Sequence, residues 1–171
     1  LASLADKSLV VPDQERAQTH YRLLETVRQY ARDRLEKGRG SAALRGRHRD
    51  YYLALAEEAN PKLKSAEQAE WLRRLEEEHE NLRAGLEWSL VEAGSEGGLR
   101  LCGALQRFWW THGHLTEGRQ WCTRVLCKAG AEERTRERAY VLNAAGALSN
   151  YQGDYPAAKA LHEESLAIRR E

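Results

Sequence analysis

The residues of this sequence that could carry out chemistry are its six histidines, three cysteines and clustered glutamates. His48, His79 and His112 fall at apolar positions of predicted helices, where a satisfied or half-buried histidine is the usual occupant. The acidic run from Glu76 to Glu80 is helical, and neighbouring helical residues point apart, so most of these carboxylates are expected to be solvated. No Ser/His/Asp or Cys/His set has the spacing of a known nucleophile. We therefore expect no active site and no enzymatic activity.

The cysteines suggest a cellular compartment rather than a metal site. Cys102, Cys122 and Cys127 lie in helical patterns among apolar neighbours, which is typical of small buried residues in a reducing compartment. A cytoplasmic protein is expected on this basis. His112 and His114 are near Cys122 in the sequence, but no closely spaced pair completes a four-ligand zinc set. We expect no metal and no cofactor.

Composition favours a helical protein of one domain or two small ones. The chain has 171 residues, of which 31% are charged and 42% are apolar. No apolar run reaches the roughly 18 to 20 residues that a membrane span requires. The sequence begins with Leu1 and contains no Met, so we expect it to be an excised part of a longer protein. Arg22 to Asp50 is net basic and Pro61 to Glu96 is net acidic, which fits either partner recognition or solvated faces that pack together.

Hydrophobic periodicity predicts the elements that must position these residues. Two short β-favouring runs, Ser8–Val11 and His20–Leu24, predict an N-terminal β-hairpin. The rest of the chain has apolar residues at helical spacing, interrupted by glycines, and is therefore expected to be α-helical. The predicted helices span about 25–38, 41–60, 65–92, 99–112, 116–129, 132–151 and 156–169.

An internal repeat relates the last two predicted helix pairs at a constant offset of 40 residues. A tight turn between two helices requires glycine, which Gly113 and Gly153 supply. Close approach of the paired helices requires a small residue, which Gly118 and Ala158 supply. The two hairpins are therefore expected to share one packing plan. The matched pairs are Gly113 and Gly153, Leu115 and Tyr155, Gly118 and Ala158, Trp121 and Leu161, and Leu126 and Leu166.

The segment from Arg138 to Glu171 resembles a tetratricopeptide repeat, whose unit of about 34 residues is a helical hairpin with small residues at fixed positions. The resemblance implies antiparallel helical hairpins stacked as a right-handed superhelix. The offset of 40 departs from the family's period, and Ser149 stands where an aromatic residue is usual. The residues expected to pack the repeats are Gly113, Gly118, Gly146, Gly153, Tyr155 and Ala158.

A wider resemblance covers nearly the whole chain. The stretches LADKSLV, YRLLETVRQYARDRL, RHRDYYLALAE, EHENLRAGLEWSL and GHLTEGRQW resemble the region after the nucleotide-binding module of bacterial STAND-class (NB-ARC/AP-ATPase-type) regulators. The resemblance implies that residues 1–40 end a winged-helix domain, with the hairpin as its wing, and that residues 41–171 are a tetratricopeptide-like domain. Leu23, Leu24 and Glu25 replace the family's Met-His-Asp motif, so no nucleotide contact is expected. The phosphate-binding motif GxxxxGK[ST] is absent from the sequence.

The adjacent residues Trp109 and Trp110 point about 100° apart on a helix, so both cannot face the same core. Repeat geometry implies that Trp110 lies on a concave face, where such repeats hold peptides. The alternative is that Trp110 packs on an adjacent helix. The residues expected to form a partner-binding face are Arg107, Trp110, Asn143, Asn150 and Tyr151.

Two functions remain open from the sequence. The first is a non-catalytic scaffold or sensor that binds a protein or peptide partner and restrains or relays signals to an ATPase module of the same protein. The second is DNA contact by the winged-helix region of a transcriptional regulator, through the basic residues Arg39, Arg45, Arg47, His48 and Arg49. We favour the scaffold and do not expect nucleic acid or a membrane as partners. Self-association is also expected through the last hairpin, whose Tyr155, Leu166 and Ile168 have no polar capping helix after them.

Overall fold

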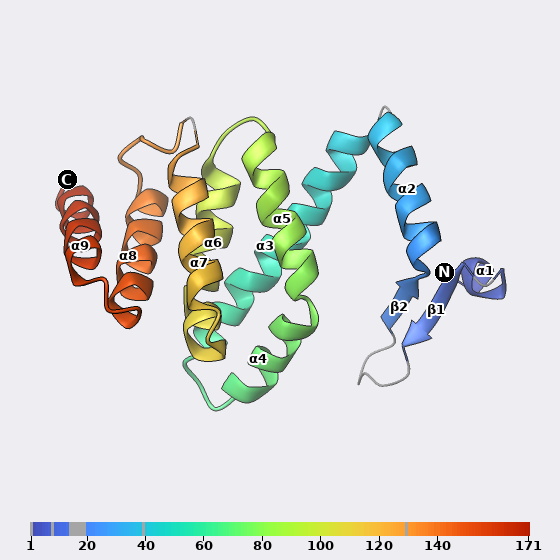
Figure 1. Ribbon diagram of the computed structural model, residues 1–171, viewed down its shortest axis with the longest axis horizontal. Coiled ribbons are helices and arrows are strands. Elements are labelled where there is room, and N and C mark those ends of the chain that lie inside the picture. Colours follow the sequence, from blue (N-terminus) through green and yellow to red (C-terminus); the bar gives the residue numbers. More distant parts are fainter. Residues whose placement is uncertain (1, 8, 14–19, 39, 129) are drawn as a thin grey trace. The chain divides into compact units, whose positions relative to one another are not determined.

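The computed structural model describes residues 2–7, 9–13, 20–38, 40–128 and 130–171 (Figure 1). Arg39 and residues 14–19 of the predicted hairpin lie outside the described residues. The chain divides into two compact units, Leu1–Leu44 and Arg45–Glu171, and helices predominate in the described residues. None of the described helices combines the length and the apolar character that crossing a membrane requires.

The described part of the first unit contains two short paired strands and two helices, and a third helix begins there. Helix α1 (Ala2–Asp6) precedes β1 (Val10–Asp13), which pairs antiparallel with β2 (His20–Leu23). The register places Val10 opposite Leu23 and Asp13 opposite His20. Helix α2 (Glu25–Lys37) follows at once, with the acidic Glu25 in its first turn, where the helix dipole favours a negative charge. It ends at the predicted glycine, Gly38.

Helix α3 (Ser41–Lys62) runs across the division between the two units and is longer than predicted. The sequence predicts an end at Asn60 because proline cannot donate a backbone hydrogen bond. The helix instead includes Pro61, whose missing N–H falls in the last turn, while the N–H of Leu63 still bonds to the carbonyl of Ala59 at 2.9 Å. The buried side chains of the helix and its end are Leu53, Leu55, Ala56, Ala59 and Leu63.

The single helix predicted for residues 65–92 is two helices, α4 (Gln68–Glu77) and α5 (His79–Val91), and this prediction was wrong. The chain departs from helical geometry at Glu78. The carboxylate of Glu78 accepts hydrogen bonds from the Tyr52 hydroxyl at 2.9 Å and from Asn81 Nδ2 at 2.7 Å. The apolar spacing continues through the break, so periodicity alone does not reveal it. Leu75, Leu82 and Leu86 are each buried as that spacing predicts.

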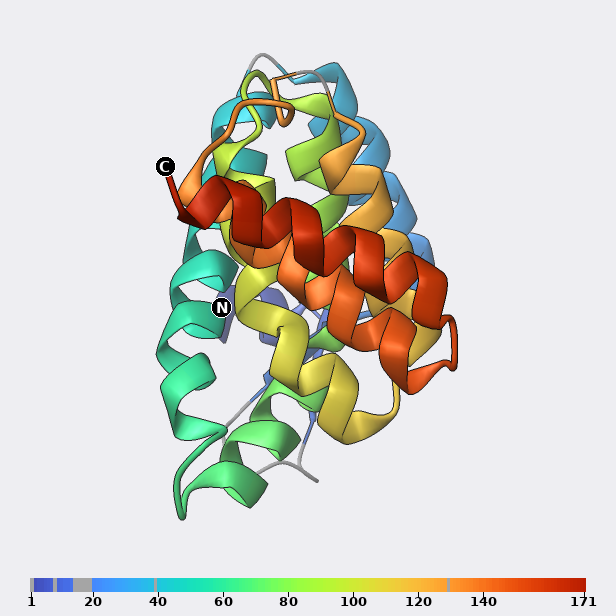
Figure 2. The same cartoon turned by 90° about the vertical axis from the view of Figure 1, so that its left-hand side faces the viewer.

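Two helical hairpins complete the second unit. The first consists of α6 (Glu96–His112) and α7 (Leu115–Leu126), and the second of α8 (Arg136–Tyr151) and α9 (Tyr155–Arg169). Gly113 and Gly153 have φ of 82° and 79°, the left-handed conformation that glycine adopts without strain. Helices α7 and α9 begin 40 residues apart, as the internal repeat predicts. Helix α8 packs against α6, α7 and α9 (Figure 2).

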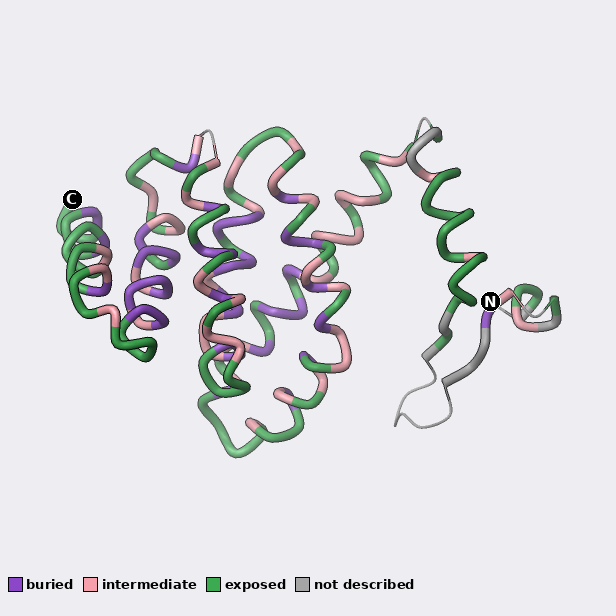
Figure 3. Tube along the Cα trace, in the orientation of Figure 1, coloured by how far each residue is buried: buried purple, intermediate pink, exposed green. Residues whose placement is uncertain are grey.

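The core of the second unit lies between its helices, from α3 to α8 (Figure 3). Phe108 and Trp109 of α6 are its largest fully buried side chains. A Cβ atom on Gly118 would lie 2.7 Å from the Trp109 ring, so the absence of a side chain lets α7 approach α6. A Cβ on Gly146 would lie 2.8 Å from the His162 ring of α9. Ala158 is also buried.

Three predicted burials differ from the structure. Tyr155, expected to pack the repeats, is 67% exposed because it stands in the first turn of α9, beside the N-terminal cap Asp154. Cys127, expected to be buried, is exposed after the end of α7, whereas Cys102 and Cys122 are buried. Ile168, expected at an open end, is buried against Ala139 and Leu142 of α8.

Candidate functional site

The structure separates the two adjacent tryptophans of α6. Trp109 is buried, whereas Trp110 is 40% exposed. The indole of Trp110 stacks on the ring of Tyr151, with centroids 5.0 Å apart and planes 21° apart. The guanidinium of Arg107 lies 5.2 Å from the centroid of the Trp110 ring, within cation–π range. Three of the five residues predicted for a partner-binding face therefore form one exposed group, the tryptophan surface: Arg107, Trp110 and Tyr151.

The two asparagines predicted for this face lie on α8 outside that stacked group. Asn143 is half-buried and Asn150 is exposed. They are seven residues apart, two helical turns, and so share one face of α8. Tyr151, the last residue of the helix, follows Asn150 and lies about 100° further round the helix. Whether their amides hold a peptide stays a prediction.

The structure contains a pocket, called the hollow below, that was not predicted from the sequence and that is lined by residues of α7 and by Gln152. It has a volume of about 430 Å³. Arg119 donates to Gln152 Oε1 at 3.1 Å and to Asp154, and Gln152 Nε2 donates to the hydroxyl of Thr116 at 3.0 Å. These bonds hold the start of α7 against the α8–α9 turn. Gln152 directly follows Tyr151, so the hollow and the tryptophan surface meet at the end of α8. Its lining residues are Thr116, Arg119, Gln120, Thr123, Arg124 and Gln152.

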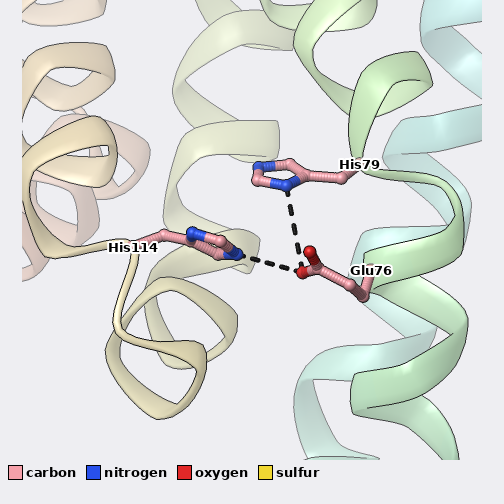
Figure 4. Close-up of side chains that lie close together, drawn as sticks. All are labelled: Glu76, His79 and His114. Atoms are coloured by element: carbon pink, nitrogen blue, oxygen red, sulfur yellow. Dashed lines mark hydrogen bonds and ion pairs between the residues drawn. The ribbon is translucent and has the colours of Figure 1, made fainter.

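A second group of polar side chains gathers where α4, α5, α6 and α7 meet. Glu76 stands in the last turn of α4, His79 begins α5, His112 ends α6, and His114 caps α7. His114 Nε2 is 3.0 Å from Glu76 Oε2, His112 Nδ1 is 3.6 Å from it, and His79 Nδ1 is 3.9 Å from it. The imidazoles of His79 and His114 both point toward the Glu76 carboxylate (Figure 4). We call these four residues the histidine cluster.

Behind the histidine cluster, Glu117 fixes the orientation of His79. The Nε2 atom of His79 lies 3.1 Å from Glu117 Oε1. Arg83 donates to both oxygens of the same carboxylate, from Nε at 2.7 Å and from Nη2 at 2.6 Å. Burial opposes ionisation of Glu117, but the Arg83 hydrogen bonds, the positive charges of His79 and Arg83 and the Trp121 hydrogen bond together outweigh it and lower the pKa of the carboxyl to about 2. Glu117 is therefore an anion at neutral pH and accepts hydrogen bonds only.

The floor of the histidine cluster is apolar. The fully buried ring of Phe108 lies 5.2, 5.3 and 5.5 Å, centroid to centroid, from the rings of His79, His112 and His114. Burial lowers the pKa of His79, because a charged imidazolium loses hydration there. A neutral His79 can act as a ligand or as a proton acceptor. Sequence analysis placed His79 and His112 on separate stripes and expected no metal site, so it did not bring these residues together.

The basic residues considered for DNA contact are partly engaged within the protein. Arg49 is 15% exposed and forms an ion pair with Glu92. The guanidinium of Arg45 lies 5.6 Å from the Trp88 ring, and His48 Nε2 is 3.4 Å from Asn81 Oδ1. Arg47 is exposed. Among the members of this set that the structure describes, Arg47 has the accessibility that a phosphate contact requires.

Comparison with known proteins places this chain near bacterial regulators of transcription. It is 43% identical over 126 residues to the "Putative HTH-type transcriptional regulator Mb0914c" of Mycobacterium bovis, and equally to proteins of the same description from two strains of Mycobacterium tuberculosis. The match covers 74% of this chain but 14% of each relative, so the chain spans a small part of their length. No protein-family model matches the chain, and no solved structure is significantly similar to it.

These relatives correct one expectation from the sequence. We did not expect nucleic acid among the partners, because the net charge is close to zero and no recognition helix is visible. Helix-turn-helix regulators read DNA through a recognition helix in the major groove. The description of the relatives therefore contradicts that expectation. The net charge of this segment is a poor guide to DNA binding by a whole regulator, because the segment matches 14% of each relative. The chain is thus a mainly helical protein, similar over most of its length to proteins described as helix-turn-helix transcriptional regulators.

Proposed function

We propose that this chain is a segment of a DNA-binding transcriptional regulator. The observation that carries the proposal is the 43% identity over 126 residues to proteins described as HTH-type regulators. Such a regulator acts in the cytoplasm, where the bacterial chromosome lies. The test is chromatin immunoprecipitation of the epitope-tagged parent protein, followed by sequencing. Discrete enriched sites next to genes whose transcription changes on deletion are expected. Enrichment no greater than in an untagged strain would refute the proposal.

Within that regulator, the first unit is proposed to be the end of a winged-helix domain. The paired strands β1 and β2, followed directly by α2, are the elements that a wing and its flanking helix would contribute. The second unit is proposed to be a tetratricopeptide-like superhelix of the kind that follows the nucleotide-binding module in STAND-class regulators. Its two stacked hairpins and their offset of 40 residues support this assignment.

The second unit is proposed to act without catalysis or cofactor, as the surface on which the regulator recognises a protein or peptide. The supporting observation is the tryptophan surface, where the exposed Trp110 indole stacks on the Tyr151 phenol beside the Arg107 guanidinium. Aromatic and arginine side chains dominate the binding energy of protein interfaces because they bury a large area with few rotatable bonds. Occupancy of this surface would restrain or release the module that carries the DNA-binding or nucleotide-binding activity.

A peptide selection tests the scaffold function. Peptides from a displayed random library are selected on the immobilised 171-residue chain and measured by fluorescence anisotropy against purified variants. Trp110→Ala and Tyr151→Ala are each expected to weaken the selected peptides by about tenfold or more, the effect of losing an interface anchor. Tyr155→Ala is the control, because Tyr155 is an aromatic residue outside the surface and is more exposed than either of these, at 67%. Equal affinity for all three variants would refute the assignment.

A second candidate function is direct DNA contact by this segment, and the description of the relatives favours it. The exposed Arg47 is its best-placed cation. Titration of labelled duplex DNA is expected to give binding that weakens steeply with salt, because phosphate contacts release condensed counterions. Arg47→Ala should then reduce the slope of log K against log salt by about 1. Arg73→Ala, an exposed arginine of α4, is the control. Binding whose affinity does not depend on salt concentration, or no binding at all, would assign DNA contact to other parts of the regulator.

A further inference from the structure

The histidine cluster combines the donor atoms that divalent transition metals prefer. One carboxylate oxygen of Glu76 and one imidazole nitrogen each from His79 and His114 all lie within 4.8 Å of one another. In a tetrahedral zinc site, metal–ligand distances near 2.1 Å place the ligand atoms about 3.4 Å apart. The separations of 3.0 Å from Glu76 Oε2 to His114 Nε2 and 3.9 Å to His79 Nδ1 lie on either side of that value.

We propose that Glu76, His79 and His114 bind one divalent transition-metal ion of the zinc class, with His112 or a water molecule as the fourth ligand. This site is separate from the function proposed above and is tested independently. Two or three imidazole nitrogens with one carboxylate suit Zn²⁺ and its neighbours, whereas Mg²⁺ and Ca²⁺ prefer oxygen ligands. His112 Nδ1 lies 3.6 Å from Glu76 Oε2, which makes it the neighbouring candidate for the fourth position.

The hydrogen bond between His79 and Glu117 supplies an independent argument. An ionised carboxylate only accepts hydrogen bonds, so the His79 nitrogen that faces Glu117, Nε2, carries the proton. In a neutral imidazole the other nitrogen, Nδ1, then presents a lone pair. That lone pair faces the Glu76 carboxylate, which is also an acceptor. The Nδ1 atom of His79 and the Glu76 carboxylate therefore face each other across the position proposed for the ion.

The hydrogen bond between His79 and Glu117 is also of the kind that metal-binding histidines make in known metalloproteins. Metal-binding histidines generally donate their second ring N–H to a carboxylate, which fixes the tautomer and the orientation of the ring. Glu117 has this relation to His79, and Arg83 holds Glu117 with two further hydrogen bonds. His79 is therefore oriented before any ion binds. Glu117 is a positioning residue and not a ligand.

Glu76 and His114, on the side of the histidine cluster away from Glu117, leave room for an ion to enter and for side chains to move. The Glu76 side chain is 44% exposed and that of His114 is 27% exposed, so an ion can enter past them from solvent. The buried His79 cannot move as freely. The Glu76 and His114 side chains are therefore expected to make the small movements that bring the three ligand atoms to equal distances from one another. Bound metal would join the junction of α4 and α5 to the α6–α7 turn, which lies 38 residues later in the sequence.

The test is a zinc titration of the complete 171-residue chain after its metals have been removed with a chelator. Competition with a chromophoric zinc indicator gives affinity and stoichiometry, and one Zn²⁺ per chain is expected. Glu76→Gln and His114→Gln should each weaken binding by about 100-fold or more. Glu117→Gln should weaken it by about 10-fold to 100-fold, the usual effect of losing an outer-shell partner. Mg²⁺ at the same concentrations should not compete.

Two controls exclude binding elsewhere. His162→Gln removes an exposed histidine of α9, and Cys127→Ser removes the exposed thiol, which is itself a good zinc ligand. Both should bind zinc as the wild type does. Circular dichroism of each variant verifies that it is folded. Co²⁺ should give the intense visible absorption of tetrahedral coordination in the wild type and lose it in His114→Gln. No stoichiometric binding, equal binding by folded Glu76→Gln and His114→Gln, or binding lost with Cys127→Ser would each overturn the proposal.

Discussion

The Trp110 indole stacks on the Tyr151 ring at 5.0 Å, although both side chains are about half exposed. This stack joins the end of α6 to the end of α8, two helices in successive hairpins. An exposed aromatic pair loses side-chain entropy when it adopts one stacked arrangement. The surrounding helices must therefore hold the two rings in place. It makes the tryptophan surface a preformed platform.

The first prediction concerns the energy of this stack. Trp110→Ala and Tyr151→Ala should be coupled by about 0.5 to 1.5 kcal/mol in a double-mutant cycle, the usual worth of an aromatic pair. The free energies of unfolding are measured in urea. Trp109→Ala is the comparison, because its side chain is fully buried and its loss should cost about 3 to 5 kcal/mol. A Trp110 variant that destabilises as strongly as Trp109→Ala would show that Trp110 is a core residue.

A second prediction tests the close approach of α6 and α7. Gly118→Ala should destabilise the protein by about 1 to 3 kcal/mol, because the added Cβ would lie 2.7 Å from the buried Trp109 ring and force it to move. Gly103→Ala is the matched control within α6. Its Cβ would meet Tyr140 at an ordinary 3.5 Å, so the higher helix propensity of alanine should stabilise the protein by up to about 1 kcal/mol. Urea unfolding measures both. Equal effects would contradict the packing described here.

A third prediction is the pH dependence of the α8–α9 turn. The Arg119 hydrogen bond, together with the N–H of Ala157, lowers the pKa of Asp154 below the ordinary value of 3.8. The folded state therefore binds fewer protons than the unfolded state. The stabilisation from Asp154 is complete above pH 3.8 and is lost as the pH falls through the lowered pKa.

Asp154→Asn isolates this effect, because asparagine also caps a helix N-terminus but carries no charge. The variant should melt at a lower temperature than the wild type at neutral pH. The difference should shrink as the pH falls below 3.8. Thermal unfolding from pH 2 to pH 7, followed by circular dichroism, is the measurement. A constant difference across this range would show that the ion pair with Arg119 contributes nothing.

A fourth prediction concerns the cysteines. Burial raises the pKa of the Cys102 thiol well above its ordinary value, and its Sγ lies 3.4 Å from that of Cys122 in the core. Thiolates are the reactive form, so iodoacetamide at neutral pH should modify the exposed Cys127 alone. All three cysteines should react in urea. Intact-mass and peptide mass spectrometry give the sites. Rapid modification of Cys102 in the folded chain would contradict its burial.

The sequence determined the local structure well. Helical periodicity located most helices, because the spacing of apolar residues is set by 3.6 residues per turn and needs no tertiary information. The turns at Gly113 and Gly153 followed from the same local reasoning, since both require a positive φ. The offset of 40 between α7 and α9 could likewise be read directly. That one of the two tryptophans must leave the core followed from their adjacency alone.

Only the tertiary structure decided which residues meet. Glu76 and His114 are 38 residues apart, and His79 and Glu117 are also 38 apart, so no spacing rule joins them. The break at Glu78 depends on Tyr52, which lies 26 residues earlier on α3. Likewise, the stack of Trp110 on Tyr151 requires the two hairpins to be packed. Sequence specifies each helix through local periodicity, whereas the histidine cluster and the tryptophan surface exist only where several helix ends converge.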